Sequence, residues 1–192
     1  MTTVRIFSYQ NSPRVYKSTI AARYSGTNIE FVGGTPKSLA NWLWDYNARE
    51  LSNNEKTQMG KISRDSRVGF SQRLYKTDEF MQHHPFGTVP AAFTENGNIG
   101  FFESNSIMRA VARIGPNKHT LYGTNPIEES IIDGFLDRTL VFAVSIQKYL
   151  LSGRNKLTED TYRSTREAVQ SYFTGIEQSL INSGPDGYIA GK

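Results

Sequence analysis

The stretch over residues 87–104, GTVPAAFTENGNIGFFES, constrains the fold more than any other part of the chain. Proline cannot donate a hydrogen bond to a strand ladder, so in a sheet it is confined to an edge, a bulge or the first residue of a strand, and Pro90 fits the last of these. The Asn-Gly pair at 96–97 is a common hairpin turn, and it lies between the apolar runs 90–93 and 99–102. The pattern therefore predicts a β-hairpin whose second strand leads directly into an acidic residue and a serine.

Apolar periodicity and helix-boundary residues place the other elements. Ser12 and Pro13 are typical of a helix start, and Gly26 is typical of a helix end. The predicted elements, in chain order, are a strand over 4–7, a helix from 12 to 26, a strand over 28–32, a short helix over 77–83, the hairpin, a helix from 104 to 114 and two long helices over 126–152 and 158–180. The two long helices can pack antiparallel, with the inner face of the second formed by Tyr162, Val169, Tyr172, Phe173, Ile176 and Leu180.

A long insertion follows the second strand and begins at Gly33-Gly34. The stretch 52–71 within it is polar, and it is predicted to be mobile. A helix is expected early in the insertion from the helical spacing of Leu39, Trp42, Leu43 and Tyr46.

The order of the elements predicts the fold class. A strand, a helix, a strand, a short helix, a hairpin and a helix, followed only by helices, are typical of a thioredoxin-like α/β domain joined to an all-α domain. We place the first domain at 1–114, with the insertion at about 34–76, and the second at 126–192. The second domain is expected to be truncated, because the terminal GYIAGK resembles a stretch that precedes a further helix in folds of this kind.

Composition limits the classes of function. A chain of 192 residues that is 38% hydrophobic can form a real core. The sequence has no run of about 18 apolar residues, and its start, MTTVRIFSYQ, lacks the features of a signal peptide, so neither a membrane span nor secretion is predicted. Because cysteine is absent, thiol nucleophiles, disulfides and cysteine zinc sites are excluded, and we expect a cytosolic protein.

The histidines do not form a metal-binding pattern. His83 and His84 are adjacent, so they cannot lie on the same face of a helix as a pair of ligands would. His119 lies in the expected linker with no cluster of carboxylates nearby. Phosphate-binding and dinucleotide-binding motifs are also missing from the sequence, so we predict no metal and no resident cofactor.

The net charge of +4 is concentrated in the insertion, which has eight cations and four anions between residues 34 and 76. One interpretation is a solvated loop. The other is a patch that binds RNA, an acidic protein or a ribosomal surface, with Lys61, Arg64 and Arg67 as its candidate residues.

Three stretches resemble a known family. PFGTVPAAF at 85–93 and FFESNSIMRAVARIG at 101–115 resemble the part of glutathione transferases that holds glutathione, and SPRVYKSTIAARYSG at 12–26 resembles the start of the gamma subunit of translation elongation factor 1, whose first domain has the transferase fold. The resemblance covers residues 3–33 and about 77–192. The insertion lies outside it.

The resemblance implies a glutathione-binding site. In the family the bond before the proline matching Pro90 is cis, which would turn the backbone groups of Val89 towards a peptide ligand. Ser104 is expected to cap its helix and to offer an anion site for a γ-glutamyl carboxylate, while Glu103 could meet the amino group of the ligand. Alternatively, Pro90 and Ser104 serve only as a strand start and a helix cap.

The resemblance also implies where a catalytic residue would lie. Transferases activate the thiol of glutathione with a side chain near the end of the first strand or the start of the first helix. Tyr9 matches that region best, with Ser12 second. The alternative is that Tyr9 is a packing residue and Ser12 a helix cap.

These observations predict an interaction domain like that of the elongation factor 1 gamma subunit, which would bind the nucleotide-exchange subunit or another translation protein and could also form a homodimer. The first alternative is an active glutathione transferase that conjugates glutathione to electrophiles, with glutathione as cosubstrate. The second is docking to RNA or a ribosome through the basic insertion.

Overall fold

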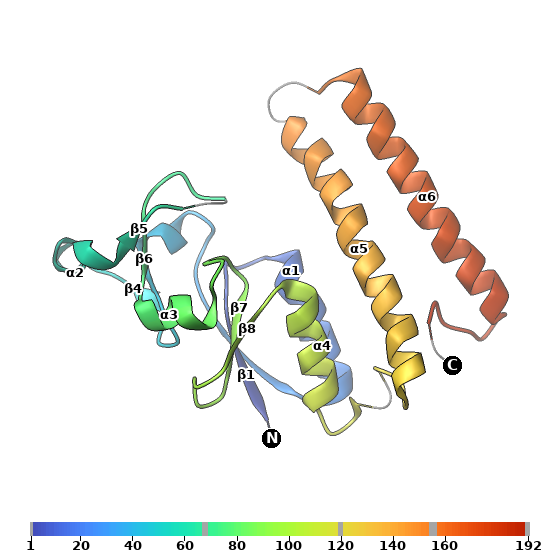
Figure 1. Cartoon of the computed structure of the whole chain (residues 1–192), viewed down its shortest axis with the longest axis horizontal. Helices are drawn as coiled ribbons and strands as arrows, with labels where there is room; N and C mark the ends of the chain where they lie inside the picture. The colour runs from blue at the N-terminus through green and yellow to red at the C-terminus, as the bar shows by residue number, and fades with distance from the viewer. Residues whose placement is uncertain (1, 67–68, 119–120, 154–156, 191–192) are drawn as a thin grey trace. The chain divides into compact units, whose positions relative to one another are not determined.

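The computed structural model in Figure 1 describes residues 2–66, 69–118, 121–153 and 157–190. The chain divides into two compact units, unit 1 over residues 1–121 and unit 2 over residues 122–192. Unit 1 contains the strands and the shorter helices, whereas unit 2 is formed by two long helices. The candidate site residues all belong to unit 1.

Unit 1 is built on a four-stranded sheet in the order β2-β1-β7-β8. The strands are β1 (Thr3–Phe7), β2 (Asn28–Val32), β7 (Ala91–Thr94) and β8 (Gly100–Phe102). β2 is parallel to β1, whereas β7 is antiparallel to both β1 and β8. The predicted hairpin is confirmed, with Ala92 directly opposite Phe101.

Two helices, α1 (Pro13–Ser25) and α4 (Ser104–Ile114), lie side by side against this sheet (Figure 1). Alternate residues of a strand point to opposite faces, so Val4 and Ile6 pack under these helices while Phe7 points to the other face. The core beneath α1 and α4 is completed by Val15, Ala21, Ala22, Ala92, Ile107 and Val111.

The first helix begins and ends as the sequence predicts. Pro13 occupies its first turn, and Gly26 has a φ of 78°, which a residue without a side chain adopts easily, while its N–H donates to the carbonyl of Ala22 at 2.9 Å. The buried side of α1 is made of small residues. Its three larger apolar residues, Tyr16, Ile20 and Tyr24, are exposed.

The insertion folds as a second four-stranded sheet in the order β4-β3-β6-β5. Its elements are β3 (Trp42–Trp44), β4 (Arg49–Glu50), α2 (Asn53–Gln58), β5 (Ser63–Arg64) and β6 (Leu74–Lys76), with 3-10 turns at Ser38–Asn41 and Gly60–Ile62. The short helix α3 (Asp78–His83) follows it and confirms the helix predicted there.

The predicted helix over Leu39–Tyr46 is therefore wrong. Trp44 is buried between Phe7 and Phe80, with ring centroids 5.4 and 5.8 Å away, and its indole N–H donates to the carbonyl of Leu39 at 2.9 Å. β3 also pairs with β6, about 30 residues further along the chain. Pairing and burial across such a separation outweigh the local spacing.

The polar stretch at 52–71 was predicted to be mobile, but its described residues are largely structured. α2 begins with a capping box, in which the Ser52 hydroxyl accepts from the N–H of Glu55 at 3.4 Å and the Glu55 carboxylate accepts from the N–H of Ser52 at 2.9 Å. The Arg49 guanidinium and hydrogen bonds from Ser52 hold the pKa of the Glu55 carboxyl at about 2. Local polar contacts therefore order this exposed segment.

Unit 2 is a pair of antiparallel helices, α5 (Pro126–Ser152) and α6 (Glu159–Ser183) (Figure 1). The Asn125 side chain caps α5 by accepting from two backbone N–H groups at 3.1 Å. Between the helices, the rings of Phe142 and Tyr172 stack with centroids 4.2 Å apart. Both predicted helices and their antiparallel packing are confirmed.

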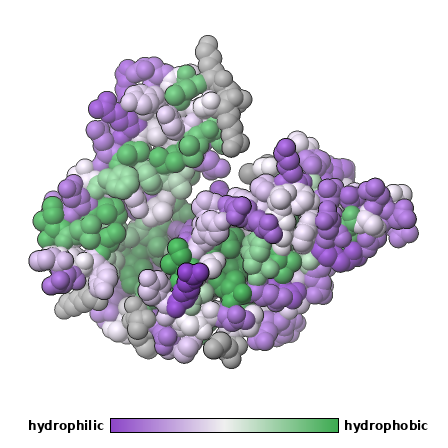
Figure 2. All heavy atoms as spheres, turned by 180° about the vertical axis from the view of Figure 1, so that it is seen from behind, coloured by the Kyte–Doolittle hydropathy of each residue, from purple (hydrophilic) through white to green (hydrophobic). Residues whose placement is uncertain are grey.

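Of the predicted inner face of α6, Tyr172 and Phe173 contact Phe142 of α5, but Tyr162, Phe173 and Leu180 keep a large exposed fraction. The pair leaves many large apolar side chains uncovered, and Figure 2 shows apolar atoms gathered along it. Within the described residues, none of the helices has the length and apolar character needed to cross a bilayer.

Candidate functional site

The Val89–Pro90 peptide bond is cis, as the resemblance implied. It lies just before β7, at the end of a loop that the insertion helps to hold. Gly87 in this loop has a φ of 60°, and its carbonyl accepts a 2.7 Å hydrogen bond from the buried Lys76 ammonium of β6. The insertion therefore supports the backbone that leads into the cis bond.

A small pocket of about 20 Å³ lies beside this bond. The volume holds about one water-sized group, such as a carboxylate oxygen. Its lining contains all four predicted glutathione-binding residues, together with two that the sequence analysis missed: Val89, Pro90, Glu103, Ser104, Arg14 and Thr88. The structure thus brings together residues from the loop before β7, the start of α4 and the first turn of α1.

The start of α4 differs from the prediction in one respect. Ser104 does not cap the helix: it is the first helical residue and is buried, whereas Glu103 holds the cap position without a capping bond from its side chain. Glu103 has a φ of 67°, a conformation that costs a non-glycine residue free energy. The positive end of α4 therefore lies at the pocket, where it favours an anionic group.

Cationic side chains of α1 add to this field. The Lys17 ammonium donates to the side-chain oxygen of Asn105, next to Ser104. Burial, with a smaller contribution from the nearby Arg14, lowers the pKa of Lys17 to about 8. Arg14 lies in the first turn of α1, directly after Pro13, and it reaches the pocket because α1 packs beside α4.

The two candidate catalytic residues line a different pocket, of about 270 Å³, between the start of α1 and Phe31 of β2. Tyr9 is partly exposed there and also packs against the aromatic core of the unit. The Ser12 hydroxyl is buried, has no hydrogen-bond partner among the described residues and makes no capping bond to α1. The structure brings Tyr9 and Ser12 together, but it does not bring them into the lining of the pocket at the cis bond.

The basic residues of the insertion are largely engaged by neighbouring groups. Arg64 forms an ion pair with Asp78, Arg49 with Glu55 at 2.6 Å, and Arg73 donates to Ser63. Of the three predicted patch residues, Lys61 is exposed, Arg64 is paired, and Arg67 lies outside the described residues.

The histidines have structural roles in the described part of the chain, where no group of three or more potential metal ligands occurs. His83 accepts a 3.2 Å hydrogen bond from the N–H of Gly100 at the outer edge of β8. His84 is buried among aromatic rings, and burial lowers its pKa to about 4.

Comparison with known proteins gives a consistent picture, although no family model matches the chain. Elongation factor 1-gamma 1 of Oryza sativa subsp. japonica is 26% identical over 132 residues, which are 69% of this chain and 23% of the relative. Elongation factor 1-gamma of Trypanosoma cruzi is 39% identical over 66 residues, 34% of this chain and 16% of the relative. The matches thus span about a quarter or less of these curated relatives.

Solved structures show the same fold. A Bombyx mori glutathione transferase aligns with a TM-score of 0.59 at 15% identity, covering 91% of this chain and 66% of that one. Ure2p in complex with glutathione aligns with a TM-score of 0.60 at 15% identity, covering 98% of this chain and 76% of that one. The predicted fold, a thioredoxin-like α/β unit followed by helices, is confirmed: the chain has the glutathione-transferase fold, and its sequence is similar to that of elongation factor 1-gamma.

Proposed function

We propose that the chain is the interaction domain of a protein like elongation factor 1-gamma, and that it binds the nucleotide-exchange subunit or another translation protein in the cytosol. The observation that carries this proposal is an apolar stripe on α1. Tyr16, Ile20 and Tyr24 are 48%, 57% and 64% exposed, and their spacing of four residues places them on successive turns of one face. Contiguous exposed apolar residues mark interaction surfaces more often than scattered ones do.

The charge on α1 adds specificity to this stripe. The helix has no acidic residue, and Arg23 is exposed next to Tyr24, whereas Arg14 lines the pocket at the cis bond and the Lys17 ammonium donates to Asn105. A partner that offers apolar side chains bordered by carboxylates would complement it in shape and charge. The similarity to elongation factor 1-gamma supports a subunit of the elongation factor complex as that partner.

Binding is better supported than catalysis. Activation of a glutathione thiol would need a suitable side chain beside the bound tripeptide, and Tyr9 and Ser12 are the candidates here. The Ser12 hydroxyl is buried, and Tyr9 lines a pocket separate from the one formed by Glu103 and Ser104. The residues that would hold glutathione and those that would act on it are therefore not assembled in one cavity.

Co-expression with the exchange subunit of elongation factor 1 tests the proposal. We expect a complex in size-exclusion chromatography with light scattering, which also reports any homodimer. The triple variant Tyr16→Ser, Ile20→Ser, Tyr24→Ser should weaken the complex at least tenfold, because central apolar contacts dominate interfaces. Ile99→Ser, which removes an exposed apolar side chain from the β7–β8 turn, is the matched control and should bind normally. If no translation protein binds, or if the triple variant binds like the wild type, the proposal is wrong.

A second candidate function is glutathione binding, because Arg14, Glu103 and Ser104 converge on one pocket beside the cis bond. Retention on immobilised glutathione tests it, with Arg14→Ala expected to elute early and Arg23→Ala, on the same helix but outside the pocket lining, expected to behave like the wild type. Conjugation of an electrophilic aromatic that is lost in Tyr9→Phe would show that the chain is a transferase. Retention without conjugation would show a binding site only.

A further inference from the structure

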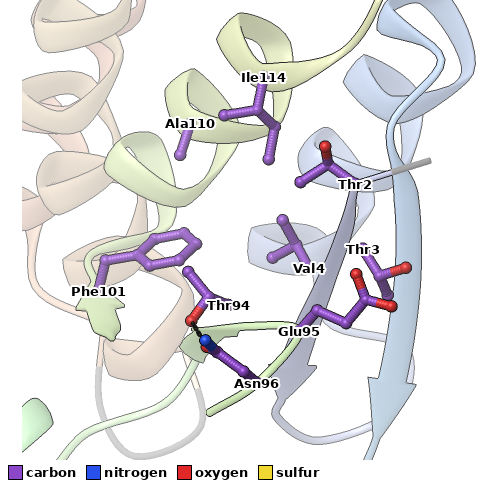
Figure 3. A pocket seen from close by; sticks show the side chains of 9 residues that line it. All are labelled: Thr2, Thr3, Val4, Thr94, Glu95, Asn96, Phe101, Ala110 and Ile114. Atoms are coloured by element: carbon purple, nitrogen blue, oxygen red, sulfur yellow. Dashed lines mark hydrogen bonds between the residues drawn. The ribbon is translucent and has the colours of Figure 1, made fainter. Parts of the chain in front are cut away.

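Unit 1 has a larger pocket at the opposite end of α4 from the cis bond. Its volume is about 470 Å³, within the range of about 300–1,000 Å³ that small-molecule sites usually have. The lining comes from the start of β1, the end of β7 with its turn, β8 and the second half of α4 (Figure 3). It shares no residue with the pocket at the cis bond or with the apolar stripe on α1.

The walls of this pocket are apolar. Figure 3 shows Ala110 and Ile114 projecting from α4 towards Val4 of β1 and Phe101 of β8. Alanine at position 110 is too short to fill the space between the helix and the sheet. A planar apolar group can therefore enter between Ile114 on one side and Phe101 on the other, where its burial is favourable.

The polar groups of the pocket differ in their availability. The Thr94 hydroxyl donates to the side-chain oxygen of Asn96 at 2.7 Å, and the same oxygen accepts from the N–H of Asn98, so these groups are used within the turn. Glu95 is the one charged side chain among the described lining residues. Its carboxylate has no hydrogen bond or ion pair within the described part of the chain, and Figure 3 shows it at the side of the pocket next to Thr3.

We propose that this pocket binds a small aromatic amine, whose ring lies between α4 and the sheet and whose ammonium group pairs with the Glu95 carboxylate. The chemistry excludes an aromatic acid as the preferred ligand, because no described lining residue supplies a cation while Glu95 repels a second carboxylate. This site goes beyond the proposed function, since it uses neither the stripe on α1 nor the glutathione residues.

Three naphthalene derivatives of nearly equal size separate ring burial from charge: naphthylmethylamine, naphthylmethanol and naphthoate. Titration of the full chain is followed by NMR, using the methyl signals of Val4, Ala110 and Ile114. We expect saturable shifts at these methyls, with the amine binding about three- to fivefold more tightly than the alcohol, as an exposed ion pair allows, and naphthoate binding most weakly.

Variants test the two contacts separately. Glu95→Gln should remove the preference for the amine over the alcohol, whereas Glu79→Gln, an exposed acid on α3 outside the pocket, should keep it. Ala110→Met should occupy the space next to Ile114 where the ring is expected to lie and weaken all three compounds at least tenfold, while Ala110→Ser, of similar volume to alanine, should bind like the wild type.

The results that would overturn the proposal are equally specific. The proposal is wrong if none of the three compounds shifts the pocket methyls saturably, or if the amine and the carboxylate bind equally. It is also wrong if the Ala110→Met variant folds normally by circular dichroism and binds the compounds as the wild type does. None of these results bears on the partner complex, so the proposed function stands or falls independently.

Discussion

The imidazole of His84 lies edge-on to the ring of Phe93, with centroids 4.7 Å apart, in the core shared by the two sheets of unit 1. Both ring nitrogens are buried without a hydrogen-bond partner in the described residues. The ring of Phe80 also packs against the imidazole, with centroids 4.8 Å apart. A polar ring thus occupies a position where only its neutral form is compatible with the surroundings.

This burial makes the stability of the fold depend on pH. The pKa of His84 is lowered to about 4 by burial, with a smaller contribution from His83, while in the unfolded chain it is near 6.5. Between these values the unfolded chain binds a proton that the folded chain does not, so the free energy of unfolding falls as pH decreases from about 6.5 to about 4. The linkage relation gives a loss of up to about 3 kcal/mol.

Urea unfolding of the wild type and His84→Leu across this pH range measures the effect. The difference between the two proteins cancels the contribution of the carboxyl groups. We expect the variant to lose less stability than the wild type by up to about 3 kcal/mol towards pH 4, and to be near the wild type at pH 7 because it also removes unpaired polar atoms. Parallel pH profiles of the two proteins would contradict this account.

The insertion should unfold together with the main sheet, because the Trp44 side chain is buried against Phe7 of β1 and Phe80 of α3. Trp44→Ala removes the largest buried side chain of this core and should reduce the free energy of unfolding by about 3–5 kcal/mol. Trp42→Ala, on the same strand but only partly buried, should cost less. A variant in which the insertion melts separately, while hydrogen exchange of β1 stays unchanged, would contradict a shared core.

The hairpin and α1 were predicted correctly because their own residues restrict the conformation of the backbone. The hairpin follows from an Asn-Gly turn between two apolar runs, and α1 from Pro13 and Gly26, because these residues limit the backbone by their own conformations. The insertion could not be predicted in the same way. Its strands are two or three residues long, and β3 depends on pairing with β6, so their signal is distributed over distant parts of the chain.

The candidate site was predictable in part for a related reason. The residues at the cis bond and at the start of α4 lie within two stretches that are recognisable in the sequence, and the structure brings them into one pocket. Arg14 reaches the same pocket from α1, and only the packing of α1 beside α4 shows that it does. The exposure of Tyr16, Ile20 and Tyr24 likewise depends on which side of α1 contacts the sheet. Their spacing of four residues places them on one face of the helix but does not show whether that face is buried or exposed.

The backbone of Glu103 provides a test of whether the start of α4 is shaped for a ligand. Its φ of 67° is easily adopted by glycine, so Glu103→Gly should leave the fold intact and change the free energy of unfolding by no more than about 1 kcal/mol. The change is stabilising if the relief of backbone strain exceeds the added flexibility of the unfolded chain.

Glu103→Gln keeps a side chain at the strained position and removes only its charge. If the carboxylate meets the amino group of glutathione, both variants should elute early from immobilised glutathione, because both lack the charge that pairs with that amino group. Retention equal to the wild type in both would assign Glu103 a purely structural position, whereas a large loss of stability in Glu103→Gly would show that its side chain supports the helix start.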